Sequence, residues 1–390
     1  MVSADVAAVP FRLGRRPWLD GMRAFAVLSV VAYHERFLLP RSHIPWVGYG
    51  GNLGVDVFFA ISGFLITSLL LEERRRTGAV GLGGFYSRRA RRLFPAVGAL
   101  LAVIVIGALV FASPDGRSQM LEEAAATATY SANWTQAFGL TTPLHQLSHT
   151  WSLAVEEQFY LLWPLALLGL LAIGLRGRRL AVFLSGLALV AVLWRTEAAP
   201  HLHWSPVRIY AGFDTRCDGL LIGCALAVAM HHRLLPTGAG ITWIRRALGV
   251  AGAMAIIALI HNPLVINNVI HLTPIDASAV VGLSTAAIIW ALVEESDSLP
   301  ARVLSWRPIA GTGRISYGIY LYSYPVSLLM SRQIGHRIGA RKLVVLDVAL
   351  TFAIALLSYF TIERVFRRPH RAEPPEPVAP PAGATVAGPS

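Results

Sequence analysis

Residues 22–35 read MRAFAVLSVVAYHE, an apolar run with Arg23 near one end and His34 near the other. Ionisable side chains inside a membrane span are costly, and they usually face the protein interior. Arg23 and His34 are eleven positions apart, which is close to three helical turns. We therefore expect both side chains on one face of a helix, roughly 16 Å apart along its axis.

The whole chain has the composition of an integral membrane protein. Of its 390 residues, 55% are hydrophobic and only 14% are charged, and the mean hydropathy is +0.55. Apolar blocks recur that are long enough to cross a hydrocarbon core of roughly 30 Å as helices. The sequence predicts an all-α, polytopic integral membrane protein with about ten transmembrane helices, at residues 20–39, 52–71, 93–112, 151–173, 180–194, 215–231, 246–262, 277–294, 314–331 and 343–361.

Basic residues predict the orientation of these spans. With an even number of spans, most arginine clusters, including residues 74–76 and 88–92, fall on the side of the two termini, which should be the cytoplasm. This imbalance explains the net charge of +12 without a nucleic-acid partner. Residues 332–342 do not fit this orientation. They carry four basic side chains, yet the number of spans places them on the outer side of the membrane. Either this loop departs from the rule or the number of spans near it differs by one.

Three regions are expected along the chain. Residues 1–18 form a cytoplasmic N-terminal segment, residues 19–370 form the transmembrane domain, and residues 371–390 form a disordered Pro/Ala-rich tail. Cys217 and Cys224 lie in one apolar block, and nothing there argues for a disulfide or a metal site.

Asp56 lies in the second predicted span. If the first two spans form an antiparallel hairpin, Asp56 reaches the depth of residue 35, where its carboxylate could orient the His34 ring. The alternative places Asp56 at the membrane surface. Glu35 points about 100° away from His34 on the helix, and we expect it at the interface.

The fourth predicted span opens with further polar side chains. Ser152 and Glu156 are four residues apart and His149 lies one turn earlier, so the three share a face at the depth expected for His34. The alternative is structural: Ser152 caps the helix and Glu156 lies near its first turn. No Gly-x-Ser-x-Gly motif occurs in the chain, which argues against a serine hydrolase.

The arginines Arg88, Arg89 and Arg92 lie in the loop that precedes the third span. They are explained by topology alone, but paired guanidinium donors also bind phosphates well. An anionic cytoplasmic ligand at this loop is the functional alternative.

Together these motifs resemble the membrane-bound acyltransferase-3 family of bacterial O-acyltransferases. The resemblance rests on Leu19-Asp20-Gly21 with Arg23 and His34, and it continues through GVDVFFAISGFLI at residues 54–66 and the arginine motif at 88–95. Further matches are HTWSLAVEEQFYLLWP at residues 149–164, RCDGLLIGCALA from Arg216, and ISYGIYLYSYPV and IERVFRR near the C-terminus. The match covers about residues 20–370. It departs at Ser323, where the family often has histidine, and at Val365, where it has proline.

The resemblance implies transfer of an acyl group, commonly acetyl, from acyl-CoA to a hydroxyl. The implied acceptor is a cell-surface glycan, a lipid-linked sugar or a macrolide antibiotic, in the last case within antibiotic biosynthesis. Acyl-CoA is a co-substrate, and no tightly bound cofactor is implied. His34 is the expected base, and Asp56 or Glu156 is expected to support its ring or to help bind the sugar. The expected substrate-binding residues are Arg23, Arg88, Arg89, Arg92, His149, Ser152 and Arg216. The rival hypothesis is a multispan transporter or flippase of a glycolipid or drug that uses the same charges.

Overall fold

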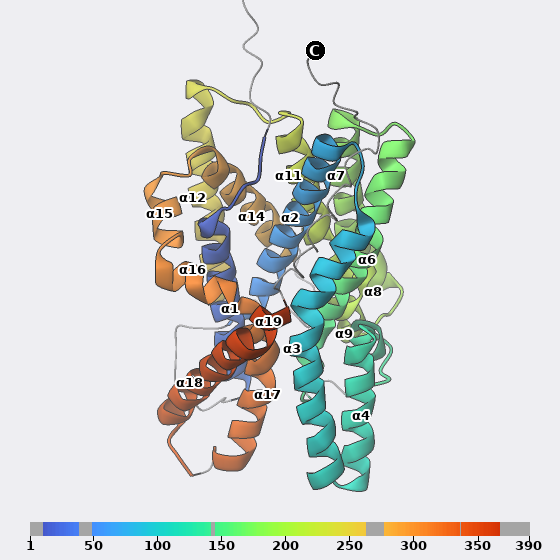
Figure 1. Ribbon diagram of the computed structural model, residues 1–390, viewed down its shortest axis with the longest axis vertical. Coiled ribbons are helices and arrows are strands. Elements are labelled where there is room, and N and C mark those ends of the chain that lie inside the picture. The colour runs from blue at the N-terminus through green and yellow to red at the C-terminus, as the bar shows by residue number, and fades with distance from the viewer. Residues whose placement is uncertain (1–10, 39–48, 142–144, 263–276, 336, 367–390) are drawn as a thin grey trace, which may run out of the picture.

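The computed structural model describes residues 11–38, 49–141, 145–262, 277–335 and 337–366. Within these ranges the chain is a bundle of helices without a β-strand (Figure 1). The predicted tail at 371–390 and residues 1–10 of the N-terminal segment lie outside the described residues.

Each of the ten predicted apolar ranges coincides with a helix. These helices are α1 (Pro17–Leu38), α2 (Gly54–Thr77), α3 (Leu82–Phe111), α6 (Trp151–Ala172), α7 (Gly177–Leu193), α11 (Asp218–His231), α12 (Ala239–His261), α14 (Ala277–Glu294), α17 (Ser316–Ile334) and α18 (Ala340–Ser358). In the described part of the chain, seven helical stretches, those containing α2, α3, α6, α7, α12, α14 and α18, are long and apolar enough to cross a membrane. The prediction of an all-α polytopic membrane protein is confirmed. Since residues 332–342 join α17 directly to α18, an additional helix there does not explain their basic side chains.

Residues 113–150 lie between the third and fourth predicted spans, and much of this connection is helical. Ser113 accepts a hydrogen bond from Gly116 N at 3.3 Å and Pro114 occupies the first turn, so helix α4 (Pro114–Ala128) begins there. The other short elements are η1 (Gly51–Leu53), α5 (Ala132–Ala137), η2 (Ser148–Thr150), η3 (Trp194–Ala198), α8 (Ala199–His201), α9 (Pro206–Ala211), α10 (Phe213–Arg216), α15 (Leu299–Leu304), α16 (Arg307–Arg314), η4 (Tyr359–Glu363) and α19 (Arg364–Phe366).

Helix α2 occupies the middle of the bundle (Figure 1). It packs against α1, α6, α11 and α14, and most of its residues are buried. Helices α3, α7, α12 and α18 instead leave large apolar side chains exposed, among them Val103, Val190, Met254 and Val345. Such surfaces are suited to lipid, while the polar side chains considered below lie on the inward faces of α1, α2, α6 and α17.

Two glycines bring α2 and α11 into close contact. A Cβ atom on Gly63 would lie 1.9 Å from Leu220 O, and one on Gly223 would lie 2.1 Å from Ala60 O. Small residues commonly allow transmembrane helices to approach in this way. The spacing of α2 and α11 therefore depends on the absence of side chains at these two positions.

Gly63→Ala is expected to lower the free energy of unfolding by about 1–3 kcal/mol, because its Cβ would overlap backbone that cannot move freely. Gly107→Ala is the matched control, since Gly107 lies in α3 with nothing within 4 Å of a built Cβ. The control should leave stability unchanged or raise it through helix propensity. Thermal unfolding of both variants in detergent measures the difference, and equal midpoints would contradict the packing argument.

Candidate active site

His34 is buried against α6 and α17. The His34 ring centroid lies 6.3 Å from that of His149 and 4.9 Å from that of Tyr324, and His34 is only 7% exposed. Helix α1 supplies His34, while η2 supplies His149 immediately before α6 begins. The structure therefore places His149 beside His34 as predicted, but the prediction that Glu156 lies at the same depth is wrong, because Glu156 shares a cavity with Arg23 instead.

A hydrogen bond determines the tautomer of His149. Its Nε2 atom lies 3.1 Å from Leu321 O, and a carbonyl oxygen can only accept, so Nε2 carries the hydrogen. In the neutral ring Nδ1 is then an acceptor, and this atom is buried without a hydrogen-bond partner among the described residues. His149 thus presents an unused lone pair close to His34.

Ser323 contacts the His34 ring from α17. The Ser323 Oγ atom lies 3.5 Å from His34 Nδ1, a long contact, and Ser323 donates its own hydrogen to Tyr320 O at 3.3 Å. Ser323 Oγ can therefore accept from Nδ1–H, which leaves the lone pair of His34 on Nε2. The sequence put a role for position 323 in doubt, and the structure places it beside the candidate base.

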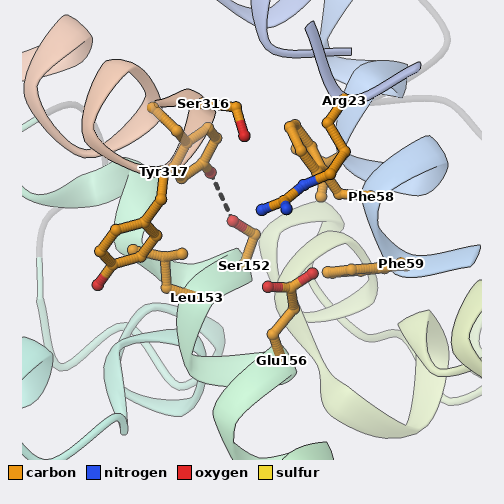
Figure 2. A pocket seen from close by; sticks show the side chains of 10 residues that line it. Arg23, Phe58, Phe59, Ser152, Leu153, Glu156, Ser316 and Tyr317 are labelled. Carbon is orange, nitrogen blue, oxygen red and sulfur yellow. Dashed lines mark hydrogen bonds between the residues drawn. The ribbon is translucent and has the colours of Figure 1, made fainter. Parts of the chain in front are cut away.

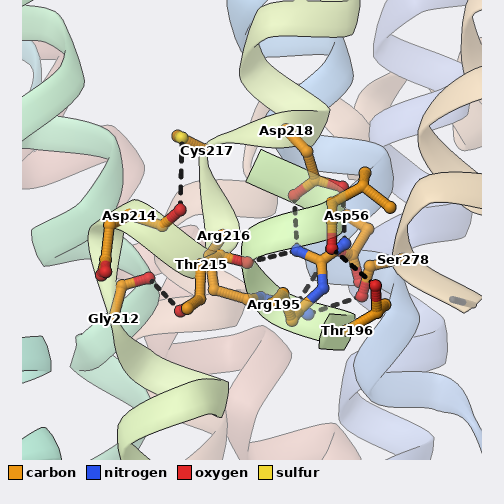
Figure 3. Close-up of polar contacts among 11 residues, drawn as sticks. Asp56, Arg195, Thr196, Gly212, Asp214, Thr215, Arg216, Cys217, Asp218 and Ser278 are labelled. Atoms are coloured by element: carbon orange, nitrogen blue, oxygen red, sulfur yellow. Dashed lines mark hydrogen bonds and ion pairs between the residues drawn. The ribbon is translucent and has the colours of Figure 1, made fainter. Parts of the chain in front are cut away.

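The predicted pairing of Asp56 with His34 is wrong. Asp56 Oδ1 forms an ion pair with Arg216 at 2.9 Å, and both side chains are buried (Figure 3). Arg216 also donates to the Ser278 hydroxyl and lies over the rings of Trp151 and Tyr210. A buried carboxylate requires a cationic partner more than it requires a neutral imidazole, so α2 turns Asp56 toward Arg216.

Arg23 and Glu156 line a narrow cavity of about 50 Å³, which lies nearer the start of α1 than His34 does. Ser152, Phe59, Ser316 and other side chains complete the walls, and the Arg23 and Glu156 side chains both extend into this space (Figure 2). The Glu156 carboxylate accepts a hydrogen bond from Ser62 at 2.8 Å.

Ser152 does not cap α6, so the capping alternative is wrong. Its hydroxyl is hydrogen-bonded to Tyr320 OH and lies 3.4 Å from His149 O, while Thr150 occupies the cap position. Tyr320 OH in turn donates to His149 O at 2.8 Å. Ser152 and Tyr320 line the cavity of Arg23 and Glu156 and also contact His149, so they lie between the two.

Because α1 and α6 run in opposite directions, their polar residues match in order. Arg23 lies with Glu156, and His34 lies with His149, at levels roughly 16 Å apart along α1. We call this arrangement the polar column. It is what the three-turn spacing of Arg23 and His34 predicted, and α6 supplies its second side.

A larger arginine-lined cavity of about 430 Å³ lies between α2 and α3. Its polar walls are Glu72, Glu73, Arg76, Arg88, Arg89 and Arg92. Arg88 is largely exposed and lies 3.9 Å from Glu73, whereas Arg89 packs 3.1 Å from the Tyr160 ring centroid and 3.5 Å from Glu157. Arg89 contacts Glu157, the neighbour of Glu156 on α6, so this cavity lies near the Arg23 end of the polar column.

The comparison with known proteins identifies the family of the chain. The profile of an acyltransferase domain matches residues 16–363, which is most of the chain. The chain belongs to the acyltransferase-3 family.

Curated relatives of this acyltransferase-3 chain include enzymes named for cell-wall modification. The chain is 36% identical over 367 residues to the peptidoglycan O-acetyltransferase OatA of Listeria monocytogenes, 36% identical over 371 residues to the putative peptidoglycan O-acetyltransferase YrhL of Bacillus subtilis, and 33% identical over 359 residues to the O-acetyltransferase OatA of Staphylococcus aureus. Each match covers 90% of this chain but only 55–57% of the relative. The chain thus spans about half the length of these relatives. No solved structure matches it.

Two further ion pairs in the acyltransferase-3 domain were missed from the sequence. Arg195 binds Asp218 through two hydrogen bonds of 2.8 and 2.9 Å, and Arg208 binds Asp214 through two of 2.9 Å. Partial burial acts to raise the pKa of Asp214, but hydrogen bonds from Arg208 and Trp194 hold it below its ordinary value. These pairs tie η3 and α9 to the segment that carries Arg216, and Figure 3 shows the pair of Arg195 and Asp218. No spacing rule links residues that lie 23 positions apart, so the sequence carried no signal for the first pair.

Glu123 on α4 holds the turn that carries His149. It accepts a hydrogen bond from Leu147 N at 3.2 Å, and burial raises its pKa from 4.5 to about 7. Because the folded pKa is raised, its stabilising contribution is complete below the unfolded value and is lost as the pH rises through about 7. We expect thermal stability to fall over about pH 5–8, and Glu123→Gln should flatten this fall. Unfolding midpoints across that range measure it, with the exposed Glu122→Gln as control.

Proposed function

We propose that this protein is a membrane O-acyltransferase that transfers an acyl group, expected to be acetyl, from acyl-CoA to a hydroxyl of a cell-surface glycan. The observation that carries the proposal is the polar column, which joins an anion-binding end to a buried histidine with an unused lone pair. The names of the relatives favour a cell-wall glycan over a lipid-linked sugar or a macrolide as acceptor. Both termini lie in the cytoplasm in this proposal, which the distribution of the arginine clusters supports.

The reaction assigns separate roles to the two ends of the column. His34 Nε2 takes the proton of the acceptor hydroxyl as its oxygen attacks the thioester carbonyl. A C–O bond forms and the C–S bond breaks, and CoA leaves as a thiolate that then takes up a proton. A thiolate is a good leaving group, so no separate strong acid is required at the sulfur.

The arginine-lined cavity is suited to the anionic end of acyl-CoA. Its volume of about 430 Å³ lies in the usual range for ligand sites, and four arginines against two glutamates give it a net positive charge. Guanidinium groups bind phosphate oxygens through paired donors. The thin pantetheine arm would then extend past Arg23 toward His34. The narrow cavity lined by Arg23 and Glu156 would form the first part of this path.

The deciding experiment uses the purified protein in vesicles with labelled acetyl-CoA and a hydroxylated acceptor. Three acceptors, a peptidoglycan fragment, a lipid-linked sugar and a macrolide, are supplied separately. We expect labelled ester on the peptidoglycan fragment. Movement of an acceptor across the vesicle membrane without ester formation would overturn the enzyme proposal in favour of a transporter.

Arg88→Ala is expected to raise the acyl-CoA concentration for half-maximal rate about tenfold and to leave kcat nearly unchanged, because it removes binding that ground state and transition state share. The exposed Arg178→Ala, outside this cavity, is the matched control. Steady-state rates over a series of acyl-CoA concentrations measure the effect. An unchanged dependence on acyl-CoA would contradict a phosphate-binding role.

A further inference from the structure

The first residue of α17 is a buried serine whose hydroxyl is unused. Ser316 is 1% exposed, and its Oγ atom has no hydrogen-bond partner among the described residues. Burying a hydroxyl in this way costs free energy, because it has lost its water and gained no partner in the protein. Orphaned polar groups of this kind are rare, so a role in binding a ligand is a reasonable explanation where the group lines a cavity.

The cavity beside Ser316 is the one that Arg23 and Glu156 line. Figure 2 shows the polar ends of these three side chains directed into one space. They come from three helices, α17, α1 and α6. Although Arg23 and Glu156 share the cavity, they form no ion pair with each other in the described part of the chain. The guanidinium and the carboxyl group are therefore both available to a ligand.

The lining offers donors and an acceptor within a small space. Arg23 only donates, and the Ser316 hydroxyl can also donate, so both suit a carbonyl oxygen. Glu156 Oε1 accepts a hydrogen bond from Ser62, which leaves Oε2 to accept from an N–H group. Most of the remaining lining is apolar and includes Val55, Phe58, Phe59 and Leu153. A small group that carries one C=O and one N–H matches these walls.

A secondary amide is such a group. The cavity volume of about 50 Å³ exceeds the roughly 10–15 Å³ that one water molecule requires, so there is room for a few heavy atoms. We propose that Arg23, Ser316 and Glu156 form a binding site for a secondary amide of a substrate. Arg23 and Ser316 donate to the amide oxygen, and Glu156 accepts from the amide N–H.

This amide site rests on the function proposed above, and both substrates of that function can supply the group. The pantetheine arm of acyl-CoA contains two secondary amides, and an amino-sugar acceptor carries one in its acetamido group. The position of the site favours pantetheine, because the cavity lies toward the arginine-lined end of the polar column. An amide loses its water inside the protein, and the amide site replaces the lost hydrogen bonds on the way to His34.

Binding to the purified protein tests the amide site without turnover. CoA contains the pantetheine arm, whereas 3′,5′-ADP carries phosphates on adenosine but no arm. Ser316→Ala should weaken CoA binding about two- to tenfold, the usual effect of one hydrogen bond, and leave 3′,5′-ADP binding unchanged. Arg88→Ala should weaken the binding of both ligands, because it removes a phosphate contact. Isothermal titration calorimetry in detergent measures these affinities.

Substrate analogues identify the amide that is bound. S-acetylpantetheine has both amides of the arm, and S-pentyl thioacetate has none. Ser316→Ala should raise the S-acetylpantetheine concentration for half-maximal rate about two- to tenfold, with kcat nearly unchanged, and have no effect with S-pentyl thioacetate. The acceptors triacetylchitotriose and cellotriose differ in their acetamido groups. An effect of Ser316→Ala that appears only with triacetylchitotriose would assign the amide to the acceptor.

Thermal unfolding separates ligand binding from a structural role of Ser316. Since its hydroxyl has no partner in the described structure, Ser316→Ala should leave the unfolding midpoint unchanged or raise it. Ser331→Ala is the matched control, because Ser331 lies on the same helix and donates to Leu328 O at 2.9 Å. This control should keep the wild-type affinity for CoA.

Two results would overturn the amide site. One is Ser316→Ala with wild-type affinities and wild-type rates for every ligand. The other is an equal loss with all donors, acceptors and nucleotides, together with a lowered unfolding midpoint, which would make Ser316 a packing residue.

The proposed function fails in a different way. A protein whose CoA affinity depends on Ser316 but which transfers no acyl group would overturn the enzyme and keep the amide site. Acyl transfer that is indifferent to Ser316→Ala would overturn the amide site and keep the enzyme.

Discussion

Replacing His34 by alanine is expected to reduce acyl transfer by about 10²–10⁴-fold, the usual contribution of a general base. The reason is geometric: His34 is buried, and its Nδ1 contact with Ser323 leaves Nε2 as the proton acceptor. The measurement is the initial rate of ester formation at saturating acetyl-CoA, with the amount of folded protein checked by size-exclusion chromatography. The acyl-CoA concentration that gives half the maximal rate should change little, because the arginine-lined cavity lies at the other end of the polar column.

His261→Ala is the matched control for this variant, because His261 is exposed at the end of α12 and its ring hydrogen-bonds to Ile257 O of the same helix. It should retain wild-type rates. Near-normal turnover in His34→Ala would remove His34 as the base. In that case His149, whose ring lies 6.3 Å from that of His34 and whose Nδ1 is buried without a partner among the described residues, would be the next residue to replace.

Asp56→Asn is expected to lower the free energy of unfolding by about 3–5 kcal/mol, because it leaves the Arg216 guanidinium buried without its counter-charge. The 2.9 Å ion pair lies between two almost fully buried side chains, so solvent cannot replace the lost partner. Thermal unfolding in detergent, compared with that of wild type, measures the loss. We expect no change in the pH profile of the remaining activity, since Asp56 does not contact His34.

A double variant separates the ion pair from a catalytic role of Asp56. Asp56→Asn combined with Arg216→Met removes both charges, and the double change should be much less destabilising than the single one. Wild-type stability in Asp56→Asn, together with a shifted pH profile, would instead restore the predicted contact with His34.

Helix positions were predictable because they depend on local composition. The ten apolar ranges each became a helix, since a run of about twenty apolar residues has few other ways to satisfy its backbone in a membrane. The shared face of Arg23 and His34 was predictable for a similar reason, because helical periodicity alone sets it. The depth of His149 followed from the antiparallel order of the spans.

Contacts across helices were less predictable. The predicted depth of Asp56 was wrong, because Gly54, two residues before it, packs against Ala26 and Ser29 of α1 and not against residue 35. The choice between His34 and Arg216 depends on the rotation of α2 against α11 and on the cost of a buried charge. The expectation of an interfacial Glu35 was wrong for a similar reason, because Glu35 is buried and accepts a hydrogen bond from Ser327 on α17, about 290 residues further along the chain.

The sequence by itself determined the membrane class, the order of the spans, the family resemblance and the line of Arg23 and His34 along one helix. Each of these follows from composition, periodicity or motif, which are local properties. Only the tertiary structure decided the partners: Arg216 for Asp56, Ser323 for His34, and Ser327 for Glu35. Buried polar groups must find partners within reach, and which groups are within reach is set by how the helices pack.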